Sequence, residues 1–399
     1  MPPLRLRAMT LTSALGAGLA PTLQALRTRR SGVQRRHWET VTDLDTCIGE
    51  VDGIDAVELP AELAHFDCRN NRLAELALRQ DGFDAAVRDV IARVGADRVG
   101  VFVGTSTSGI HTSEQAYRHR DPATGALPTS LDYRHTHNSY SLADYVRHRF
   151  GLSGTACVIS TACSSSAKVF GMAQRMVACG LVDAAIVGGV DSLCLTTLYG
   201  FQSLQLLSPQ PCMPFDVNRQ GINIGEAGAF ALLEPAPQAQ AGDILLTGVG
   251  ESSDAHHMSA PHPQGLGARL AMQAALNMAG LQPADIGYIA LHGTSTPSND
   301  AAESQAVEAL FGQHVPCSSI KGHTGHTLGA AGAINAVVAA LALRHDLAPA
   351  GAGTREVDPA LPCHYLIETL DRPLRHVLSN AFGFGGNNCS LVLSKQGAA

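Results

Sequence analysis

The chain has 399 residues, of which 45% are hydrophobic and 16% charged, and its formal net charge is −7. This acidic balance argues against broad nucleic-acid binding, and no apolar run of about 18 residues is free of polar breaks, so no membrane-spanning helix is predicted. The length suffices for one large core or for two fused half-domains.

The chain begins with a predicted strand over residues 4–11, a turn at Gly16 and Gly18, and a helix. Two prolines follow Met1, and threonine and glycine interrupt the apolar stretch, so a signal peptide is not predicted and a cytoplasmic protein is expected. Cys163 is predicted to begin a helix that ends near Gly180. Short apolar runs predict buried strands over 99–103, 156–160, 184–188 and 229–233.

The second part of the chain repeats this order of elements. After a connector over 235–242, strands are predicted over 244–249, 286–291 and 390–393, and helices over 264–279 and 328–344. Two of the predicted strands, one in each part, end in a Gly-Thr-Ser turn. The pattern predicts two diverged copies of one α/β half, residues 1–240 and 241–399, whose strands are covered on both faces.

Cys163 is the candidate nucleophile, because a β-branched run gives way at this point to Ala-Cys-Ser-Ser-Ser. A helix N-terminus presents unpaired N–H groups and partial positive charge, which lower the pKa of a thiol and can hold an oxyanion. The ten cysteines include no Cys-x-x-Cys pair, so zinc and dithiol redox motifs are absent and a reducing compartment fits.

Two histidines have settings that suggest chemistry. His292 lies in Leu-His-Gly-Thr-Ser-Thr-Pro and His326 in Lys-Gly-His-Thr-Gly-His, both at predicted loops, where open α/β folds place reactive groups. Neutral imidazoles that donate N–H bonds stabilise an enolate or a thioester oxyanion. Lys321 lies five residues before His326, and Glu303 is predicted to pair with it, since a buried lysine needs a partner.

Other motifs point away from cofactors. His256, His257 and His262 lie in an irregular segment without carboxylates at ligand spacing, so no metal site is predicted. The glycine-rich run 380–388 is not a Walker loop, and no dinucleotide fingerprint is present, so neither ATP nor NAD is implied. Its Phe-Gly-Phe-Gly-Gly core suits a gate that approaches a substrate closely.

Five motifs, in order, resemble those of the β-ketoacyl-acyl-carrier-protein synthases of the elongating, decarboxylating type, in the thiolase-like superfamily. The resemblance covers nearly the whole chain. It implies a duplicated, five-layered αβαβα fold, substrates carried on the phosphopantetheine of an acyl carrier protein, no other cofactor, and a homodimer or a ketosynthase heterodimer. The motifs are Thr161-Ala-Cys-Ser-Ser-Ser, Pro214-Phe-Asp with Gly225-Glu, His292-Gly-Thr-Ser-Thr-Pro, the run 321–332, and Phe382-Gly-Phe-Gly-Gly.

The same resemblance implies roles for single residues. Cys163 is similar to the acyl-accepting nucleophile, and His292 and His326 to the pair that binds the malonyl thioester and promotes loss of CO₂. Lys321 and Glu303 correspond to a supporting ion pair. The resemblance also implies an oxyanion hole at the backbone N–H groups of Cys163 and Phe384, a gate at Phe382 and Phe384, an acyl-pocket residue at Thr107, and carrier-protein contacts at Arg69 and Arg72.

Some segments depart from the family pattern, chiefly Leu291, Gly322-His323 and the polar stretch 220–225. They leave the pathway open between fatty-acid elongation and a specialised polyene or polyketide-like product. One alternative is a thiolase-type CoA acyltransferase, for which Cys389 is the only candidate base. The other is a non-catalytic, chain-length-type partner subunit, although such partners generally lack the nucleophile.

Overall fold

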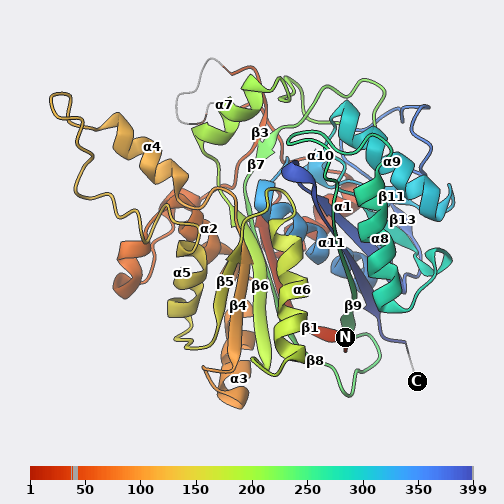
Figure 1. Ribbon diagram of the computed structural model, residues 1–399, viewed down its shortest axis with the longest axis horizontal. Helices are drawn as coiled ribbons and strands as arrows, with labels where there is room; N and C mark the ends of the chain where they lie inside the picture. Colours follow the sequence, from red (N-terminus) through yellow and green to blue (C-terminus); the bar gives the residue numbers. More distant parts are fainter. Residues whose placement is uncertain (37, 39–43, 398–399) are drawn as a thin grey trace.

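The computed structural model describes residues 1–36, 38 and 44–397. One mixed sheet runs through the molecule in the strand order β11-β10-β14-β15-β9-β1-β8-β6-β4-β5, with β2 (Gly16–Ala17) beside β1 (Figure 1). The strands before residue 240 are β1 (Leu4–Ser13), β4 (Val99–Gly104), β5 (Ala156–Ile159), β6 (Ala184–Asp191) and β8 (Ala227–Pro235). Those after it are β9 (Ile244–Ser253), β10 (Tyr288–Ala290), β11 (Cys317–Ser318), β14 (His376–Phe382) and β15 (Asn387–Lys395).

The two parts of the chain have the same strand topology, which confirms the predicted duplication. In the first part, β4 is parallel to β5 and β6, and β8 is antiparallel to β6 and β1. In the second, β10 is parallel to β11 and β14, and β15 is antiparallel to β14 and β9. The halves join where β1 and β9 pair antiparallel, and the predicted boundary at residue 240 lies between β8 and β9.

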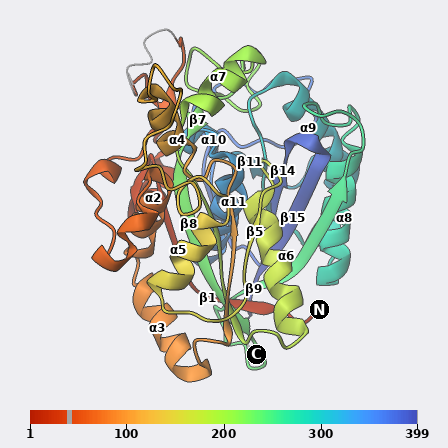
Figure 2. The ribbon, with the colours of Figure 1, turned by 60° about the vertical axis from the view of Figure 1, so that its left-hand side comes forward.

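Helices form three further layers (Figure 2). Helices α6 (Ser165–Ala178) and α11 (Ala331–His345) lie between the two half-sheets, α2, α3 and α5 cover one outer face, and α8 and α9 cover the other. The outer helices span Arg69–Leu78 (α2), Phe83–Val94 (α3), Ser141–Arg149 (α5), Leu266–Ala279 (α8) and Pro297–Phe311 (α9). The fold is therefore the duplicated αβαβα arrangement of the thiolase-like class.

The remaining elements are short or peripheral. The helices are α1 (Leu19–Thr28), α4 (Ile110–Arg118), α7 (Leu195–Ser203), α10 (Lys321–Thr324) and the single turns η1 (Ile54–Ala56), η2 (Ala61–Phe66), η3 (Pro283–Asp285), η4 (Leu328–Ala330) and η5 (Phe384–Gly386). The strands are β3 (Ile48–Gly49), which pairs with β7 (Ile224–Gly225), and β12 (Leu347–Ala348), which pairs with β13 (Leu370–Asp371).

The small residues of α11 allow the central helices to approach closely. A Cβ atom at Gly332 would lie 2.4 Å from the backbone nitrogen of Ala167 on α6, so glycine is required at this crossing. Among the described residues, one stretch, Leu328–His345, is long and apolar enough to cross a membrane, and 89% of it is buried inside the molecule. Its burial is that of a core helix.

Candidate active site

The turn between β5 and α6 presents Cys163 to a cavity. Ala162 adopts a left-handed conformation with φ of 51°, which turns the chain sharply immediately before the cysteine. Helix α6 begins at Ser165, so Cys163 precedes its first turn, and its side chain is 6% exposed. A Cβ atom at Gly104 would lie 2.4 Å from the Ser166 nitrogen, so this glycine lets β4 pack directly against the turn.

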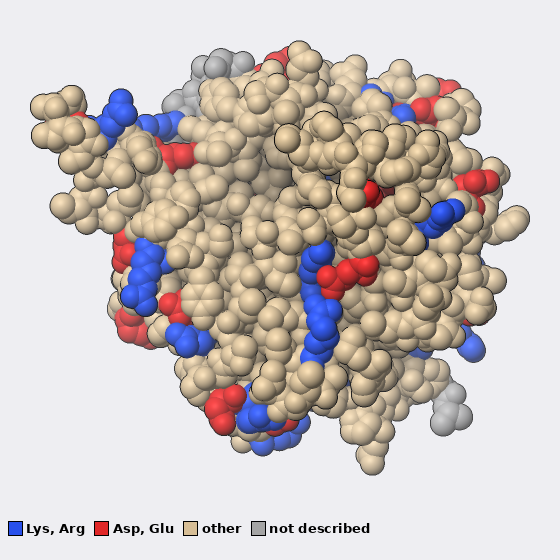
Figure 3. All heavy atoms as spheres, in the orientation of Figure 1, with Lys and Arg blue, Asp and Glu red and all other residues tan. Residues whose placement is uncertain are grey.

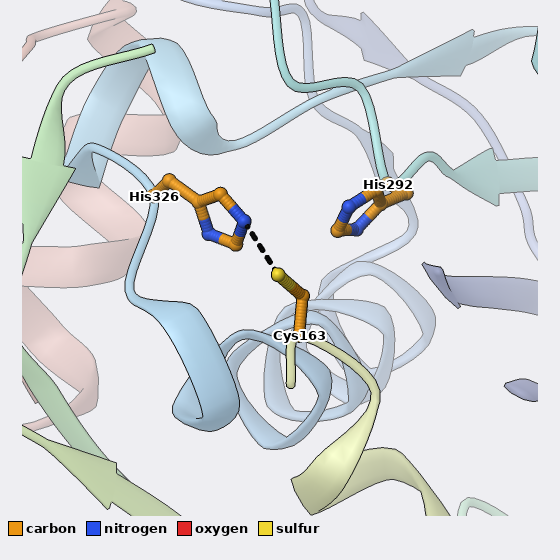
Figure 4. Close-up of side chains that lie close together, drawn as sticks. All are labelled: Cys163, His292 and His326. Carbon is orange, nitrogen blue, oxygen red and sulfur yellow. Dashed lines mark hydrogen bonds between the residues drawn. The ribbon is translucent and has the colours of Figure 1, made fainter. Parts of the chain in front are cut away.

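His326 lies beside this sulfur, as Figure 4 shows. Its Nε2 is 3.0 Å from the Sγ atom of Cys163. Its Nδ1 accepts a hydrogen bond of 3.1 Å from the backbone N–H of Leu328, so the proton of the neutral ring is on Nε2. The imidazole therefore directs an N–H donor at the sulfur.

His292 approaches the same point from the end of β10 (Figure 4). Its ring centre is 5.5 Å from that of His326, and the two rings meet nearly edge to face at 81°. The ammonium group of Lys321 lies 3.3 Å from Nδ1 of His292 and also donates to the His292 carbonyl oxygen. Because Lys321 donates to Nδ1, the proton of this ring is also on Nε2. The sulfur and one nitrogen of each ring lie within 4.8 Å of one another.

The predicted ion pair of Lys321 and Glu303 is wrong as a direct contact. Both oxygens of Glu303 accept backbone hydrogen bonds, from His292 at 2.8 Å and Gly293 at 2.7 Å, and Asn380 Nδ2 donates to Oε1 at 3.1 Å. Within the described ranges, no ion pair of 4.0 Å or less joins Lys321 to Glu303, although the charge of Glu303 raises the pKa of Lys321 from a longer distance. The carboxylate and the ammonium instead hold His292 from two sides.

Burial determines the ionisation of this cluster. Burial, with the nearby charge of Lys321, lowers the pKa of His292 and of His326 well below the ordinary value near 6.5. Burial also lowers the pKa of Lys321 to about 8 and raises the pKa of Glu303 to about 7. Both imidazoles are therefore neutral at pH 7, each with an N–H group available for an oxygen atom.

The pKa of Cys163 differs from the expectation drawn from its helix position. Burial raises the pKa of this thiol to about 11, although Lys321 and the backbone N–H groups of Phe384 and Cys163 act in the opposite direction. The desolvation of a buried thiolate outweighs the partial charge of the helix N-terminus. The group is therefore a thiol at neutral pH.

The glycine-rich turn after β14 closes over Cys163. A Cβ atom at Gly383 would lie 2.8 Å from the carbonyl oxygen of Thr161, so this turn packs directly on the cysteine turn. The ring of Phe384 lies 5.7 Å from that of Phe201 on α7, and Phe382 lies 5.9 Å from His292. The cavity is lined by Cys163, both histidines, the two phenylalanines, Phe201, Leu206, Ile222, Asp254, Thr294, Thr296 and their neighbours.

Thr107 does not line this cavity. It is 1% exposed, and its backbone N–H and its hydroxyl donate to the same Asp191 oxygen at 2.8 and 2.9 Å. Asp191 also accepts bonds from Thr105, Ser106 and Gly329, so it joins the end of β4 to the segment after His326. The prediction that Thr107 lines the acyl pocket is therefore wrong for this cavity, because Asp191 directs the hydroxyl inward.

The predicted carrier-binding arginines also lie outside the site. Arg69 is 7% exposed and forms ion pairs with Glu226 at 2.6 Å and Asp55 at 2.9 Å, so it is a structural residue, and the prediction for it is wrong. Arg72 is partly exposed, but its guanidinium forms two hydrogen bonds of 2.6 Å with Asp67. The sequence could not reveal the pair of Arg69 and Glu226, because these residues are 157 positions apart.

One functional residue that the sequence analysis missed is Asn335, the single polar side chain within residues 331–343 of α11. Its amide donates to the carbonyl oxygens of Leu291 and Asn380, both at 3.0 Å. It therefore ties together the strand ends that carry His292 and the glycine-rich turn. A lone amide in an otherwise apolar helical stretch was the available signal.

Comparisons with known proteins establish the family. Residues 9–239 match the family model described as beta-ketoacyl synthase, N-terminal domain, and residues 245–355 match beta-ketoacyl synthase, C-terminal domain. The chain therefore belongs to the β-ketoacyl synthase family, whose members are acyltransferases.

Curated relatives carry the corresponding name. A 3-oxoacyl-[acyl-carrier-protein] synthase 2 of Staphylococcus aureus (strain COL) is 31% identical over 396 residues, covering 90% of this chain and 93% of the relative. The mitochondrial 3-oxoacyl-[acyl-carrier-protein] synthase of Arabidopsis thaliana is 37% identical over 269 residues, or 63% of this chain and 58% of the relative.

Solved structures extend the likeness over the whole chain. A chain of the solved complex of the ketosynthase ApeO with its chain length factor ApeC, from Xenorhabdus doucetiae, is 41% identical, with a TM-score of 0.89 over 99% of this chain and 98% of that chain. The ishigamide ketosynthase/chain length factor is 27% identical, with a TM-score of 0.88 over 99% and 100% of the two chains.

Proposed function

We propose that the chain condenses an acyl group with a malonyl group, both delivered as thioesters on an acyl carrier protein, and loses CO₂ in the process. The observation that carries this proposal is the convergence of one thiol and two neutral imidazoles on one cavity, with the Cys163 Sγ 3.0 Å from His326 Nε2. The names of the curated relatives support carrier-bound substrates.

In the first step, the sulfur of Cys163 attacks the carbonyl carbon of the acyl thioester. The backbone N–H groups of Cys163 and Phe384, which already act on this sulfur, stabilise the oxyanion. The new carbon–sulfur bond forms as the bond to phosphopantetheine breaks, and the cysteine proton leaves with the released thiol.

In the second step, the Nε2–H groups of His292 and His326 hold the thioester oxygen of malonyl-carrier. They stabilise the enolate that forms as the bond to the carboxylate breaks and CO₂ departs. The enolate carbon attacks the acyl-cysteine, and the Cys163 sulfur leaves as a thiolate that takes a proton from solvent. The chain is then two carbons longer. The proposal includes no metal ion, nucleotide or other cofactor, because residues of the chain supply each group that the steps need.

The experiment follows radiolabelled CO₂ released from malonyl-carrier while intact mass spectrometry records the acyl-enzyme. We expect acylation of the enzyme, CO₂ release, and a product two carbons longer. Condensation of two CoA thioesters without malonyl-carrier would contradict the proposal and favour the thiolase-type alternative. Cys389 opposes that alternative, because it lies fully buried within β15, outside the cavity, and burial strongly raises its pKa.

We further propose that the chain pairs with a second ketosynthase-like subunit through the edge of β5. This strand ends the sheet, and its residues Ala156–Ile159 are apolar yet only half-buried. The ApeO complex supports a chain-length-type partner, and Cys163 makes this chain the catalytic member. Coexpression with such a partner is expected to give a stable complex by light scattering. A monomer, with or without the partner, would contradict the proposal.

A further inference from the structure

The rim of the catalytic cavity carries almost no charge. The only Asp, Glu, Lys or Arg residue among its described lining residues is Asp254. That carboxylate is engaged, because it accepts hydrogen bonds from Asn388 Nδ2 at 3.0 Å and from the His262 backbone at 3.2 Å. The four segments that supply most of the lining, residues 192–215, 255–268, 292–299 and 380–394, contain no charged residue apart from histidine.

Two exposed apolar side chains flank the cavity. Leu204, 50% exposed, follows α7 and precedes Leu206, which lines the cavity. Met258, 78% exposed, precedes Ser259, a lining residue in the segment on the other side. The carbonyl oxygen of Met258 accepts a 2.7 Å hydrogen bond from the N–H of Gly385, so this segment is fastened to the glycine-rich turn over Cys163.

Three arginines of the first half of the chain are already paired with carboxylates. Arg35 donates to the carbonyl oxygen of Pro209 at 2.8 Å, but its guanidinium is paired with Asp45 at 2.5 Å. Arg69 and Arg72 are paired with carboxylates, as described above. In Figure 3, the central part of the upper face, over the loops in front of α7, is tan, and charged side chains appear toward both sides of it.

We infer that this rim, defined by Leu204, Met258 and the uncharged segments around them, docks the carrier protein through apolar contacts and hydrogen bonds instead of ion pairs. The inference rests on the proposed function, because a phosphopantetheine arm that reaches Cys163 passes this rim and brings the carrier body against it. A carrier that fits has uncharged side chains around the attachment point of the arm. Such docking gains little from long-range electrostatic steering.

The first test is the salt dependence of kcat/KM for acyl-carrier. Charge-steered association falls steeply with ionic strength, whereas apolar docking does not, so we expect less than about a threefold change between about 50 and 500 mM NaCl. A decrease of about tenfold or more would overturn the inference and assign recognition to ion pairs, including those of a partner subunit.

The second test uses the variants Leu204→Asp and Met258→Asp. Placing a carboxylate in an apolar contact is expected to raise KM for acyl-carrier by about tenfold and to leave kcat unchanged. Leu181→Asp is the matched control, because Leu181 is 55% exposed and follows the end of α6 that is remote from Cys163. An unchanged KM in both rim variants would overturn the inference.

A carrier-free substrate separates this inference from the proposed function. All variants are expected to acylate Cys163 from a small acyl thioester, such as an N-acetylcysteamine thioester, at the unmodified rate, because they change only the exposed rim. If the small thioester acylates the unmodified enzyme and the rim variants keep the unmodified KM for acyl-carrier, the docking inference alone fails. If it forms no acyl-cysteine from either substrate, the proposed function fails.

Discussion

Replacing Cys163 with alanine is expected to abolish acyl-enzyme formation, with a loss of at least about 10⁴-fold in condensation. The reason is that this sulfur lies within reach of both imidazoles and of the backbone N–H group of Phe384. Intact mass spectrometry after incubation with acyl-carrier provides the measurement. An acyl adduct that persists in the alanine variant would show that the nucleophile lies elsewhere.

The variant Cys163→Gln serves as the control, because it separates the two half-reactions. It removes the thiol but leaves His292, His326 and their supports in place. We therefore expect it to form no acyl-enzyme and to continue to release CO₂ from malonyl-carrier. Loss of both reactions, in a variant that unfolds at the temperature of the unmodified enzyme, would mean that the sulfur also takes part in decarboxylation.

Replacing His326 with alanine is expected to reduce CO₂ release from malonyl-carrier by about 10²–10³-fold, the effect of removing one oxyanion donor. Acylation of Cys163 is expected to change by less than about tenfold, because the backbone N–H groups serve that step. His326→Gln is the matched comparison, since its amide can again donate from near the Nε2 position. Equal loss of both half-reactions in the alanine variant would contradict this division of roles.

The pH dependence of decarboxylation is expected to come from Lys321 and Glu303, which contact His292, and not from the two imidazoles. Both histidines have a pKa well below 6.5, so they are neutral through the working range. Lys321, whose pKa is lowered to about 8, loses its proton above that pH and releases Nδ1 of His292. Glu303, whose pKa is raised to about 7, gains a proton below that pH and weakens its hold on the His292 backbone.

The rate of CO₂ release is therefore expected to have its maximum between about pH 7 and pH 8. Lys321→Met is expected to lower the rate and to remove the alkaline decrease. An acid decrease that persists unchanged in the variant Glu303→Gln would assign it to an imidazole and contradict the neutral, buried state of the histidines.

Much of the fold could be predicted because its signals are local. The buried strands, the two central helices and the repeated order of elements follow from short apolar runs and glycine turns, which the residues themselves encode. Strand β14 and the outer helices α3, α5 and α9 were not predicted. The apolar character of β14 is interrupted by Ser379 and Asn380, and α9 has no clear apolar face, so tertiary packing decides their structure.

The sequence by itself determined the candidates Cys163, His292 and His326 and their family, because a short motif identifies reactive groups by residue type and spacing alone. Only the tertiary structure decided which polar and charged groups are in contact. It placed Lys321 at the ring of His292 and Glu303 at the backbone N–H of His292 instead of in contact with each other. It also turned Thr107 toward Asp191 and buried Arg69 against Glu226. The physical reason is that hydrogen bonds and ion pairs depend on distances of about 3 Å between residues far apart in the chain, and local patterns do not specify such distances.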